Sequence, residues 1–143
     1  MKNLRNHLIV LAAQHKGIVV STCACQYGEC FRVALESFPA ESYSTAQWYD
    51  IVSCSRTAIL DGTGIEPIVR TIDNCERNHS LGTIFEVKAG GGKLLVCTAA
   101  LDEQKASLPC KALLKSLTEY VSSEKFEPAQ TVEIEVLDKI FLS

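Results

Sequence analysis

One change of hydrophobic period, between Leu81 and Phe126, constrains the fold of this chain more than any other feature. Every second residue from Leu81 to Val87 is Leu, Thr, Phe or Val, and this period of two is typical of a half-exposed β-strand. The segment Ala89-Gly90-Gly91-Gly92 predicts a turn, because glycine adopts the positive φ angles of tight turns. Lys93–Cys97 is then a nearly unbroken apolar run, which favours a strand covered on both faces. These residues predict a β-hairpin.

An amphipathic helix is predicted directly after this hairpin. Ser107 and Pro109 are residues that favour a helix start. A single apolar stripe at helical spacing then consists of Cys110, Leu113, Leu114, Leu117, Tyr120 and Val121. Charged and polar residues, among them Lys111 and Lys115, fall on the opposite side. Burying the stripe contributes on the order of 10 kcal/mol of gross stabilisation, so we expect the helix to be packed.

The residues before Phe38 carry weaker patterns. A first helix is predicted from the spacing of Leu4, Leu8 and Leu11. Gly17 is placed to end that helix as its C-terminal cap, and Ile18–Val20 predicts a short apolar strand. The cysteine-rich and aperiodic residues 21–40 predict a loop with at most one short element.

Further elements are predicted along the rest of the chain. Ser44–Ser53 offers an N-cap followed by apolar residues at helical spacing, so we expect a short helix that buries its aromatic side. Thr57–Leu60 predicts a strand that ends in the turn Asp61-Gly62, and Pro67–Ile72 predicts another. Thr131–Leu137 alternates apolar and acidic residues, which indicates a closing strand.

The first residues resemble a secretory signal peptide, because Lys2 and Arg5 precede the apolar run Leu8–Ala13. That run is short and is followed by the polar residues Gln14-His15-Lys16, so we expect a helix rather than a signal peptide. No segment approaches the roughly 20 apolar residues of a membrane span. We therefore predict no membrane partner, and the cellular compartment stays open.

The composition is that of one globular domain. The chain has 143 residues, of which 47% are hydrophobic and 22% charged, enough to bury a core without disulfides. No internal repeat divides it, so we predict a single domain over residues 1–143. The formal net charge is −3 and the basic residues are scattered. Because phosphate neutralisation requires clustered Lys and Arg, we expect no nucleic-acid partner.

Seven cysteines are present, an odd number that a complete disulfide framework cannot use. Several lie in apolar runs, where a thiol behaves as a small hydrophobic group, so we expect free, buried thiols. A zinc site is one alternative, and its ligands would come from Cys23, Cys25, Cys30, Cys75 and His79. Their spacing matches no recognised zinc motif. The prediction is therefore that the chain binds no metal and no other cofactor.

A cysteine nucleophile is the second alternative. Cys23 or Cys25 follows the predicted strand Ile18–Val20, where related α/β folds place a reactive residue on a tight turn. Such a turn needs small residues on both sides, and only Gly28 is near. No histidine can be paired with either thiol as a base from the sequence alone.

The segment Gly90–Lys93 invites comparison with a phosphate-binding loop. That motif needs a longer glycine spacing, a Ser or Thr after the Lys, and a helix whose N-terminal amides face the phosphate. Here Leu94 follows and a strand is predicted. We interpret the segment as a hairpin turn.

Carboxylates suited to acid–base catalysis are spread along the chain at Asp50, Asp61, Asp73, Glu76 and Glu86. Glycoside hydrolysis needs two of them at a set separation, and the sequence offers no means of bringing a pair together. Each is more typical of a cap, a turn or a solvated surface. We therefore predict no catalytic residue.

A series of short motifs, taken in order, carries a resemblance. The motifs are Phe38-Pro39-Ala40-Glu41, Ser44, Gln47-Trp48-Tyr49-Asp50-Ile51, Ile59-Leu60-Asp61, Pro67-Ile68-Val69-Arg70, Ile72-Asp73-Asn74, Leu81-Gly82, Phe85-Glu86, Gly92-Lys93-Leu94-Leu95-Val96-Cys97 and Lys125-Phe126-Glu127-Pro128. Together they resemble the C-terminal region of bacterial glycoside hydrolase family 2 proteins of the β-galactosidase type. The resemblance covers residues 38–128, and the family usually has a second Trp at the position of Tyr49.

The resemblance implies an accessory α/β domain of flavodoxin-like or class I glutamine-amidotransferase-like shape. Such a domain is a three-layer sandwich around a mainly parallel sheet, here with a β-hairpin. In the family the catalytic glutamates belong to a preceding barrel. None of the barrel motifs occurs here, so no catalytic residue is carried over.

The leading prediction is a non-catalytic C-terminal module of a larger glycoside hydrolase, supporting its structure, its association or its substrate binding. Sugar or interface contacts are expected at Trp48, Tyr49, Asp50, Arg70 and Asp73. The expected partners are the other domains of the hydrolase, and carbohydrate and a homo-oligomer stay open. Relatives in the family are often exported. The alternatives are a small amidotransferase-like enzyme that uses Cys23 or Cys25, and a thiol-based metal-binding domain.

Overall fold

The computed structural model of the chain describes residues 6–10, 21–24, 34–38, 46–52, 55–101 and 107–142, with the backbone alone at 6–10, 21–24 and 141–142. Its strands are β1 (Asn6–Val10), β2 (Ser21–Ala24), β3 (Ala58–Ile59), β4 (Val69–Ile72), β5 (Ser80–Ala89) and β6 (Gly92–Cys97). Its helices are α2 (Ala46–Val52), α3 (Leu108–Ser122) and α4 (Ile134–Leu142). None of these described helices is long and apolar enough to cross a membrane.

The described strands form one six-stranded sheet in the order β1-β6-β5-β4-β2, with β3 paired to β5 beside this path. β1 and β6 run parallel, and the other four pairings are antiparallel. Short connections link β4 to β5 and β5 to β6. Such connections can join antiparallel strands only, because parallel neighbours need a crossover of about a dozen residues or more. The expected flavodoxin-like or glutamine-amidotransferase-like sandwich with a mainly parallel sheet is therefore wrong.

The predicted β-hairpin is confirmed as β5 and β6. Its ladder ends at the pair formed by Ala89 and Gly92. Gly90 and Gly91 make the turn with φ angles of 56° and 76°, which residues with side chains rarely adopt. β5 is buried from Leu81 to Val87, so it is the centre of the sheet and not a half-exposed strand.

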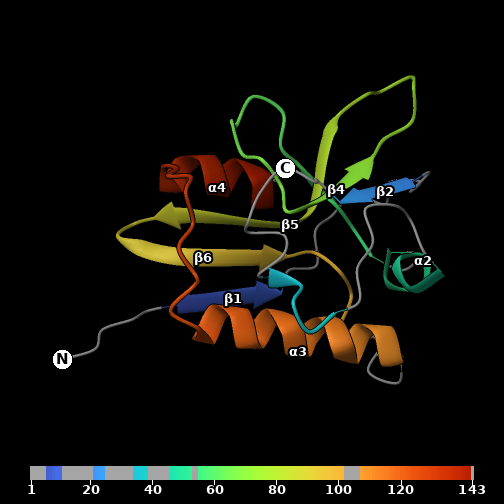
Figure 1. Cartoon of the computed structure of the whole chain (residues 1–143). Helices are drawn as coiled ribbons and strands as arrows, with labels where there is room; N and C mark the ends of the chain where they lie inside the picture. Colours follow the sequence, from blue (N-terminus) through green and yellow to red (C-terminus); the bar gives the residue numbers. More distant parts are fainter. Residues whose placement is uncertain are drawn as a thin grey trace.

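Two hydrophobic clusters pack on opposite faces of the sheet. α3 and α4 accordingly lie on opposite sides of the sheet in Figure 1. The larger cluster joins α2 and α3 to the sheet through side chains that include Trp48, Ile84, Leu95, Leu113 and Leu117. The smaller joins α4 to the other face through side chains that include Phe85, Val87, Val96, Leu137 and Ile140. The neighbours Ile84 and Phe85 thus serve different clusters, as alternation along a strand requires. The helices predicted over 44–53 and after Ser107 are confirmed as α2 and α3.

The predicted N-terminal helix is wrong. Asn6–Val10 is the strand β1, parallel to β6. A short apolar run with β-branched residues, such as Leu8-Ile9-Val10, fits a helix or a strand until a neighbour supplies hydrogen bonds. β2 lies in the segment predicted as a loop and pairs with β4. The predicted cap Gly17 and strand Ile18–Val20 lie outside the described residues.

The predicted C-terminal strand over Thr131–Leu137 is also wrong, because helix α4 begins within it. Leu137 and Ile140 are its buried side chains, and their spacing of three residues places them on one face of a helix. Thr131 alone keeps a strand-like contact, an isolated bridge to Lys88. The shorter strands predicted at 57–60 and 67–72 are confirmed within the bounds of β3 and β4.

Residues 126–132, which we call the strap, cross the tip of the hairpin and lead from α3 to α4 on the other side of the sheet. The N–H of Val132 donates to the carbonyl of Lys88 at 2.9 Å. The carboxylate of Glu127 accepts from the ammonium groups of Lys88, at 2.5 Å, and of Lys93. These two hydrogen bonds lower the pKa of Glu127 to about 2. The hairpin therefore fixes where α4 begins.

Gly82 on β5 has no room for a side chain. An added Cβ would lie 2.6 Å from Cδ1 of Leu60 and 3.0 Å from Cβ of Pro67. We expect Gly82→Ala to lower the free energy of unfolding by about 1–3 kcal/mol, because overpacking forces Leu60 off its rotamer or shifts the strand. Urea unfolding of Gly82→Ala, Leu60→Ala and the double variant checks this. The double variant should lose less than the sum of the single losses, and additive losses would contradict the clash.

Two buried threonines differ in their hydrogen bonds. Thr71 Oγ1 and Thr83 Oγ1 lie 2.6 Å apart, whereas Oγ1 of Thr57 is buried with no hydrogen-bond partner among the residues that the structure describes. We expect Thr71→Val to lower the free energy of unfolding by about 1–3 kcal/mol, because it leaves the hydroxyl of Thr83 unsatisfied. Thr57→Val should leave it unchanged or raise it by up to about 1 kcal/mol. Parallel urea titrations test the contrast, and equal losses in both variants would contradict it.

Candidate functional site

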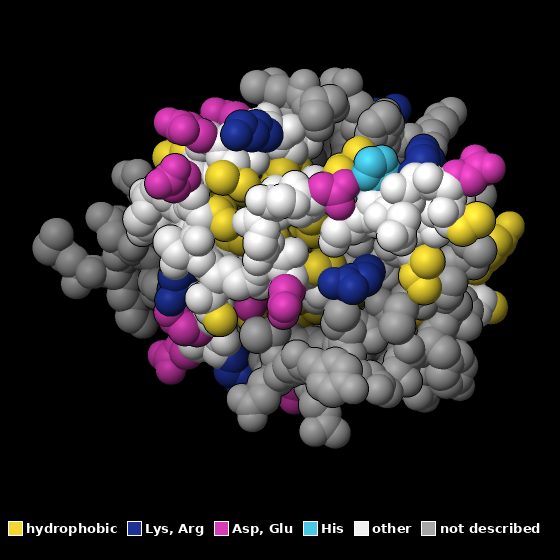
Figure 2. Space-filling model, turned by 90° about the horizontal axis from the view of Figure 1, so that it is seen from above, with side chains coloured by type: hydrophobic (Ala, Val, Ile, Leu, Met, Phe, Trp, Pro, Cys, Tyr) yellow, Lys and Arg dark blue, Asp and Glu magenta, His cyan; other side chains and the backbone are white. Residues whose placement is uncertain are grey.

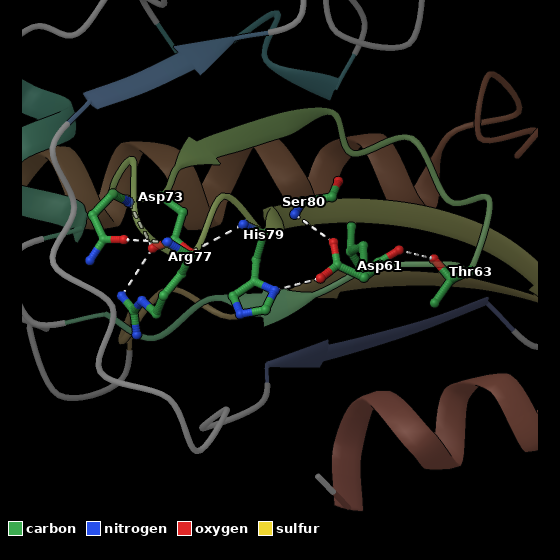
Figure 3. Close-up of polar contacts among 8 residues, drawn as sticks. Asp61, Thr63, Asp73, Arg77, His79 and Ser80 are labelled. Atoms are coloured by element: carbon green, nitrogen blue, oxygen red, sulfur yellow. Dashed lines mark hydrogen bonds and ion pairs between the residues drawn. The ribbon is translucent and has the colours of Figure 1, made fainter.

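Titratable side chains gather where the turn after β3 meets the loop between β4 and β5 (Figure 3). The cluster consists of Asp61, Asp73, Arg77 and His79. The sequence favours turns at both places, where Asp61-Gly62 and Asp73-Asn74 are typical turn residues. Asp and Asn side chains form hydrogen bonds with nearby backbone groups, and Gly and Asn tolerate positive φ angles. Gly62 has a φ of 67° in the first turn, and Asn78 has a φ of 52° in the second.

Asp61 joins the two loops. Its Oδ2 lies 2.5 Å from Nδ1 of His79, and its Oδ1 accepts the N–H of Ser80 at 2.7 Å. The hydrogen bond from the Ser80 amide and then the one with the imidazole lower the pKa of Asp61, so this carboxylate is ionised at neutral pH. The imidazole is thereby held in one orientation, with its other ring nitrogen, Nε2, outside this contact.

Asp73 holds the second loop from within. Its side chain is 2% exposed, and its carboxylate accepts from the N–H groups of Asn74 (2.8 Å) and His79 (3.2 Å). The guanidinium of Arg77 donates to the same carboxylate at 2.9 Å. Burial acts to raise the pKa of Asp73, but the two amide hydrogen bonds and the charge of Arg77 together lower it. Both oxygens of Asp73 are therefore engaged by its own loop.

An aspartate that orients a histidine through Nδ1 is an arrangement found in general bases, which act through Nε2. Such a base needs a nucleophile within hydrogen-bond reach. The hydroxyl of Thr63, which lies on the far side of Asp61 from His79 (Figure 3), donates to the carbonyl of Leu60 at 2.7 Å and accepts from the N–H of Ile65 at 3.2 Å. Across the residues that the structure describes, no three His, Cys, Asp or Glu side chains converge to hold a metal ion. The contacts of the cluster hold two loops together.

The predicted contact residues on α2 point in different directions. Trp48 is 1% exposed and packs edge-on against Phe38, with ring centroids 5.2 Å apart. Its ring belongs to the core and offers no face to a ligand. Tyr49 is 72% exposed, and Asp50 beside it is exposed. Of the aromatic pair, Tyr49 is the residue that can meet a partner.

The other two predicted contact residues lie on or after β4. Arg70 is exposed and pairs across the sheet with Gly82 of β5. Asp73, only three residues later, is turned into its loop and bonded to Arg77. Arg70 is therefore accessible at the surface, whereas the carboxylate of Asp73 makes contacts that stabilise its own loop.

Cys75 and Cys97 are free thiols. Cys97 and Cys110 are buried, as expected, and Cys75 is exposed. Burial raises the pKa of Cys97 to about 12, and the neighbouring thiol of Cys110 adds to this rise against an opposing hydrogen bond from Ala99. A thiol with so high a pKa stays protonated and is a poor nucleophile.

The two thiol-based alternatives depend on residues beyond the described side chains. Cys23 lies on β2, where the structure describes the backbone alone, and Cys25 and Cys30 lie outside the described residues. Of the zinc ligands considered from the sequence, His79 is bonded to Asp61 through Nδ1. The zinc and nucleophile hypotheses therefore stay predictions from the sequence.

Gly90–Lys93 forms the hairpin turn, as interpreted from the sequence. The ammonium group of Lys93 donates to the carbonyl of Phe126 at 3.0 Å and to the carboxylate of Glu127. Lys93 thus stabilises the strap.

Two polar pairs were missed by the sequence reasoning. Asp61 and His79 are 18 residues apart, so no local spacing indicates their contact. The available signal was that Asp61 follows one predicted strand and His79 precedes another, and these two strands, β3 and β5, pair with each other. Glu86, expected in a cap, a turn or a solvated surface, is 3% exposed and accepts a hydrogen bond from the hydroxyl of Tyr120 at 2.8 Å. Its partner comes from α3, which the strand pattern cannot reveal.

Comparison with known proteins relates this structure to one family. A family model described as a domain of unknown function, DUF8487, matches residues 27–142. The match includes α2, the strands β3 to β6, α3 and α4. A search of curated proteins finds no match. The family match covers the loop cluster and Tyr49 together with the core that supports them.

The lowered pKa values of Asp61 and Asp73 predict a loss of stability in acid. A carboxylate whose pKa is depressed in the folded state stabilises that state fully above its unfolded pKa, near 3.8, and loses this effect as the pH falls further. We expect the free energy of unfolding to decrease below about pH 4, and Asp73→Asn to flatten that decrease. Urea midpoints measured from neutral to acid pH check this. Glu76→Gln, in the same loop but exposed, should keep the wild-type slope; an unaltered slope in Asp73→Asn would contradict the assignment.

Proposed function

The chain belongs to the DUF8487 family, and we propose that it is a non-catalytic accessory domain of a carbohydrate-active enzyme, a glycoside hydrolase of the β-galactosidase type. In this proposal it supports the other domains of that enzyme and contacts carbohydrate through Tyr49. Two features support the proposal. The first is the burial of residues from the glycoside hydrolase-like motifs, and the second is the set of hydrogen bonds formed by Asp61 and Asp73.

Four of the motifs that resemble glycoside hydrolase family 2 each contribute a fully buried core residue. Trp48, Phe85, Leu95 and Phe126 come from four different motifs and are each at most 1% exposed. Residues of this kind specify how a domain packs, whereas a reaction depends on side chains placed at a site. This distribution supports a shared structural module more than a shared reaction.

The observation that carries the proposal is the use of Asp61 and Asp73. Hydrolysis of a glycosidic bond needs two carboxyl groups that face the sugar roughly 5–9.5 Å apart. Asp73 is buried and gives its oxygens to loop amides and Arg77. Asp61 gives its oxygens to Ser80 and His79. These carboxylates stabilise the domain, which suits a part that supports catalysis elsewhere.

Tyr49 supports a contact with carbohydrate. Trp48, Ile51 and Val52 anchor α2 in the core and are each at most 3% exposed, so the ring of Tyr49 stands on a fixed helix. An aromatic ring offers a large contact face with few torsions to immobilise, and its hydroxyl can form a hydrogen bond. These are the properties of a side chain that stacks on a sugar.

Two measurements on the purified chain test the proposal. The chain should release no nitrophenol from 4-nitrophenyl β-galactoside or β-glucuronide above the rate of the heat-denatured chain. In affinity electrophoresis through a β-galactan gel, Tyr49→Ala should weaken binding about 2- to 10-fold, because an aromatic contact contributes roughly 0.5–1.5 kcal/mol. Tyr49→Phe, which keeps the ring, should bind nearly as well as the wild type.

Ile72→Ala is the matched control, because Ile72 is also an exposed hydrophobic side chain, 44% exposed, but lies on β4 and not on α2. It should migrate like the wild type. Hydrolysis by the chain would contradict the non-catalytic role. Absent retention, or retention unchanged in Tyr49→Ala, would contradict the contact between α2 and carbohydrate.

A further inference from the structure

Two exposed aliphatic side chains stand at the first positions of α3 and α4. Leu108 of α3 is 78% exposed and Ile134 of α4 is 57% exposed. Leaving such a side chain in water forgoes the favourable free energy of burying it. α3 and α4 lie on opposite sides of the sheet (Figure 1), so the two side chains belong to separate surfaces.

The outward face of α3 surrounds Leu108 with basic groups. Lys111 and Lys115 follow three and seven residues later, which places them on the side of the helix that carries Leu108. Both are exposed. Lys111 forms no ion pair with any described side chain, and Lys115 has a long one of 3.8 Å with the exposed Glu119. We call Leu108, Lys111 and Lys115 the α3 surface.

Acidic residues flank Ile134 at the start of α4, where its side chain lies beside the hairpin turn, with Cδ1 3.1 Å from the place of a Cβ on Gly90. Glu133, Glu135 and Asp138 are exposed, and none of them pairs with a cation among the described side chains. Figure 2 shows acidic side chains beside hydrophobic ones on the face of the molecule seen from above, the side on which α4 lies in Figure 1. That helix contains one basic residue, Lys139. We call Ile134 with the three carboxylates the α4 surface.

We propose that the α3 surface of one copy of this chain binds the α4 surface of a second copy. Leu108 would pack near Ile134, so both aliphatic side chains would leave water. Lys111 and Lys115 would face the carboxylates of the α4 surface. A second copy is the partner because the chain carries both halves of this contact, an aliphatic centre with a basic rim and one with an acidic rim. Such complementary charge steers association and sets orientation.

The arrangement of the two surfaces determines the kind of assembly. Because they differ and lie on opposite sides of the sheet, the contact is head-to-tail and not twofold-symmetric. Each bound copy still presents one free surface, so the contact can repeat. Two short helix faces bury less than the roughly 1,200 Å² of a standard interface, so the association is weak and depends on concentration. It should also weaken at high salt, because the charges are exposed.

Charge exchange tests this contact with the chain alone. The variant Glu133→Lys/Glu135→Lys makes both surfaces basic and changes the net charge from −3 to +1, since each substitution adds two charges. The variant Lys111→Glu/Lys115→Glu makes both surfaces acidic. Sedimentation equilibrium over a concentration series should show self-association of the wild type, weakened about ten-fold or more in each variant alone. An equimolar mixture of the two variants should recover it, because basic and acidic surfaces then meet between unlike copies.

A matched control is Glu66→Lys/Glu76→Lys, which changes the net charge equally at exposed positions outside both surfaces. It should associate like the wild type, and circular dichroism should show every variant folded. A wild type that stays monomeric at the highest soluble concentration would overturn the proposal. So would variants that associate unchanged, or a mixture that does not recover. The test is independent of carbohydrate binding, so its failure leaves the proposed accessory role to its own experiment.

Discussion

The pairing of β5 with β6 is the interaction on which the rest of the structure depends. β5 also pairs with β3 and β4, and β6 also pairs with β1, so nearly every described strand is held through this hairpin. Ile84 and Phe85 point to opposite faces and enter the two hydrophobic clusters. A register slip of one residue would exchange those faces and break both clusters at once. The positive φ angles of Gly90 and Gly91 hold the register at the turn.

α4 depends on the hairpin in a second way. A helix of nine residues is marginal in water by itself, so its stability comes from its tertiary contacts. Leu137 and Ile140 cover the face that carries Phe85, and the strap holds the start of the helix through Lys88 and Glu127. The acidic residues of the α4 surface therefore point outward as a consequence of how the hairpin tip is bound.

The candidate site shows how polar groups can serve the fold. Asp61 and Asp73 lie in two loops of an antiparallel region, and their hydrogen bonds to backbone amides help to hold those loops in place. Motif spacing drew attention to Asp73 and Tyr49, but it could not indicate that one is buried and the other exposed. The contact between Asp61 and His79 arises because β3 and β4 both pair with β5, and such pairing is not local in the sequence.

The sequence by itself determined the hairpin, α2 and α3, because each has a sustained hydrophobic period and a start or turn residue that acts locally. Only the tertiary structure decided that Asn6–Val10 is a strand, that residues after Glu133 form a helix, and that the sheet is mainly antiparallel. Short apolar runs satisfy either periodicity, so their conformation follows the hydrogen bonds and apolar surface that their neighbours offer. For the same reason the partners of Glu86 and His79 became known only when distant strands and helices were brought together.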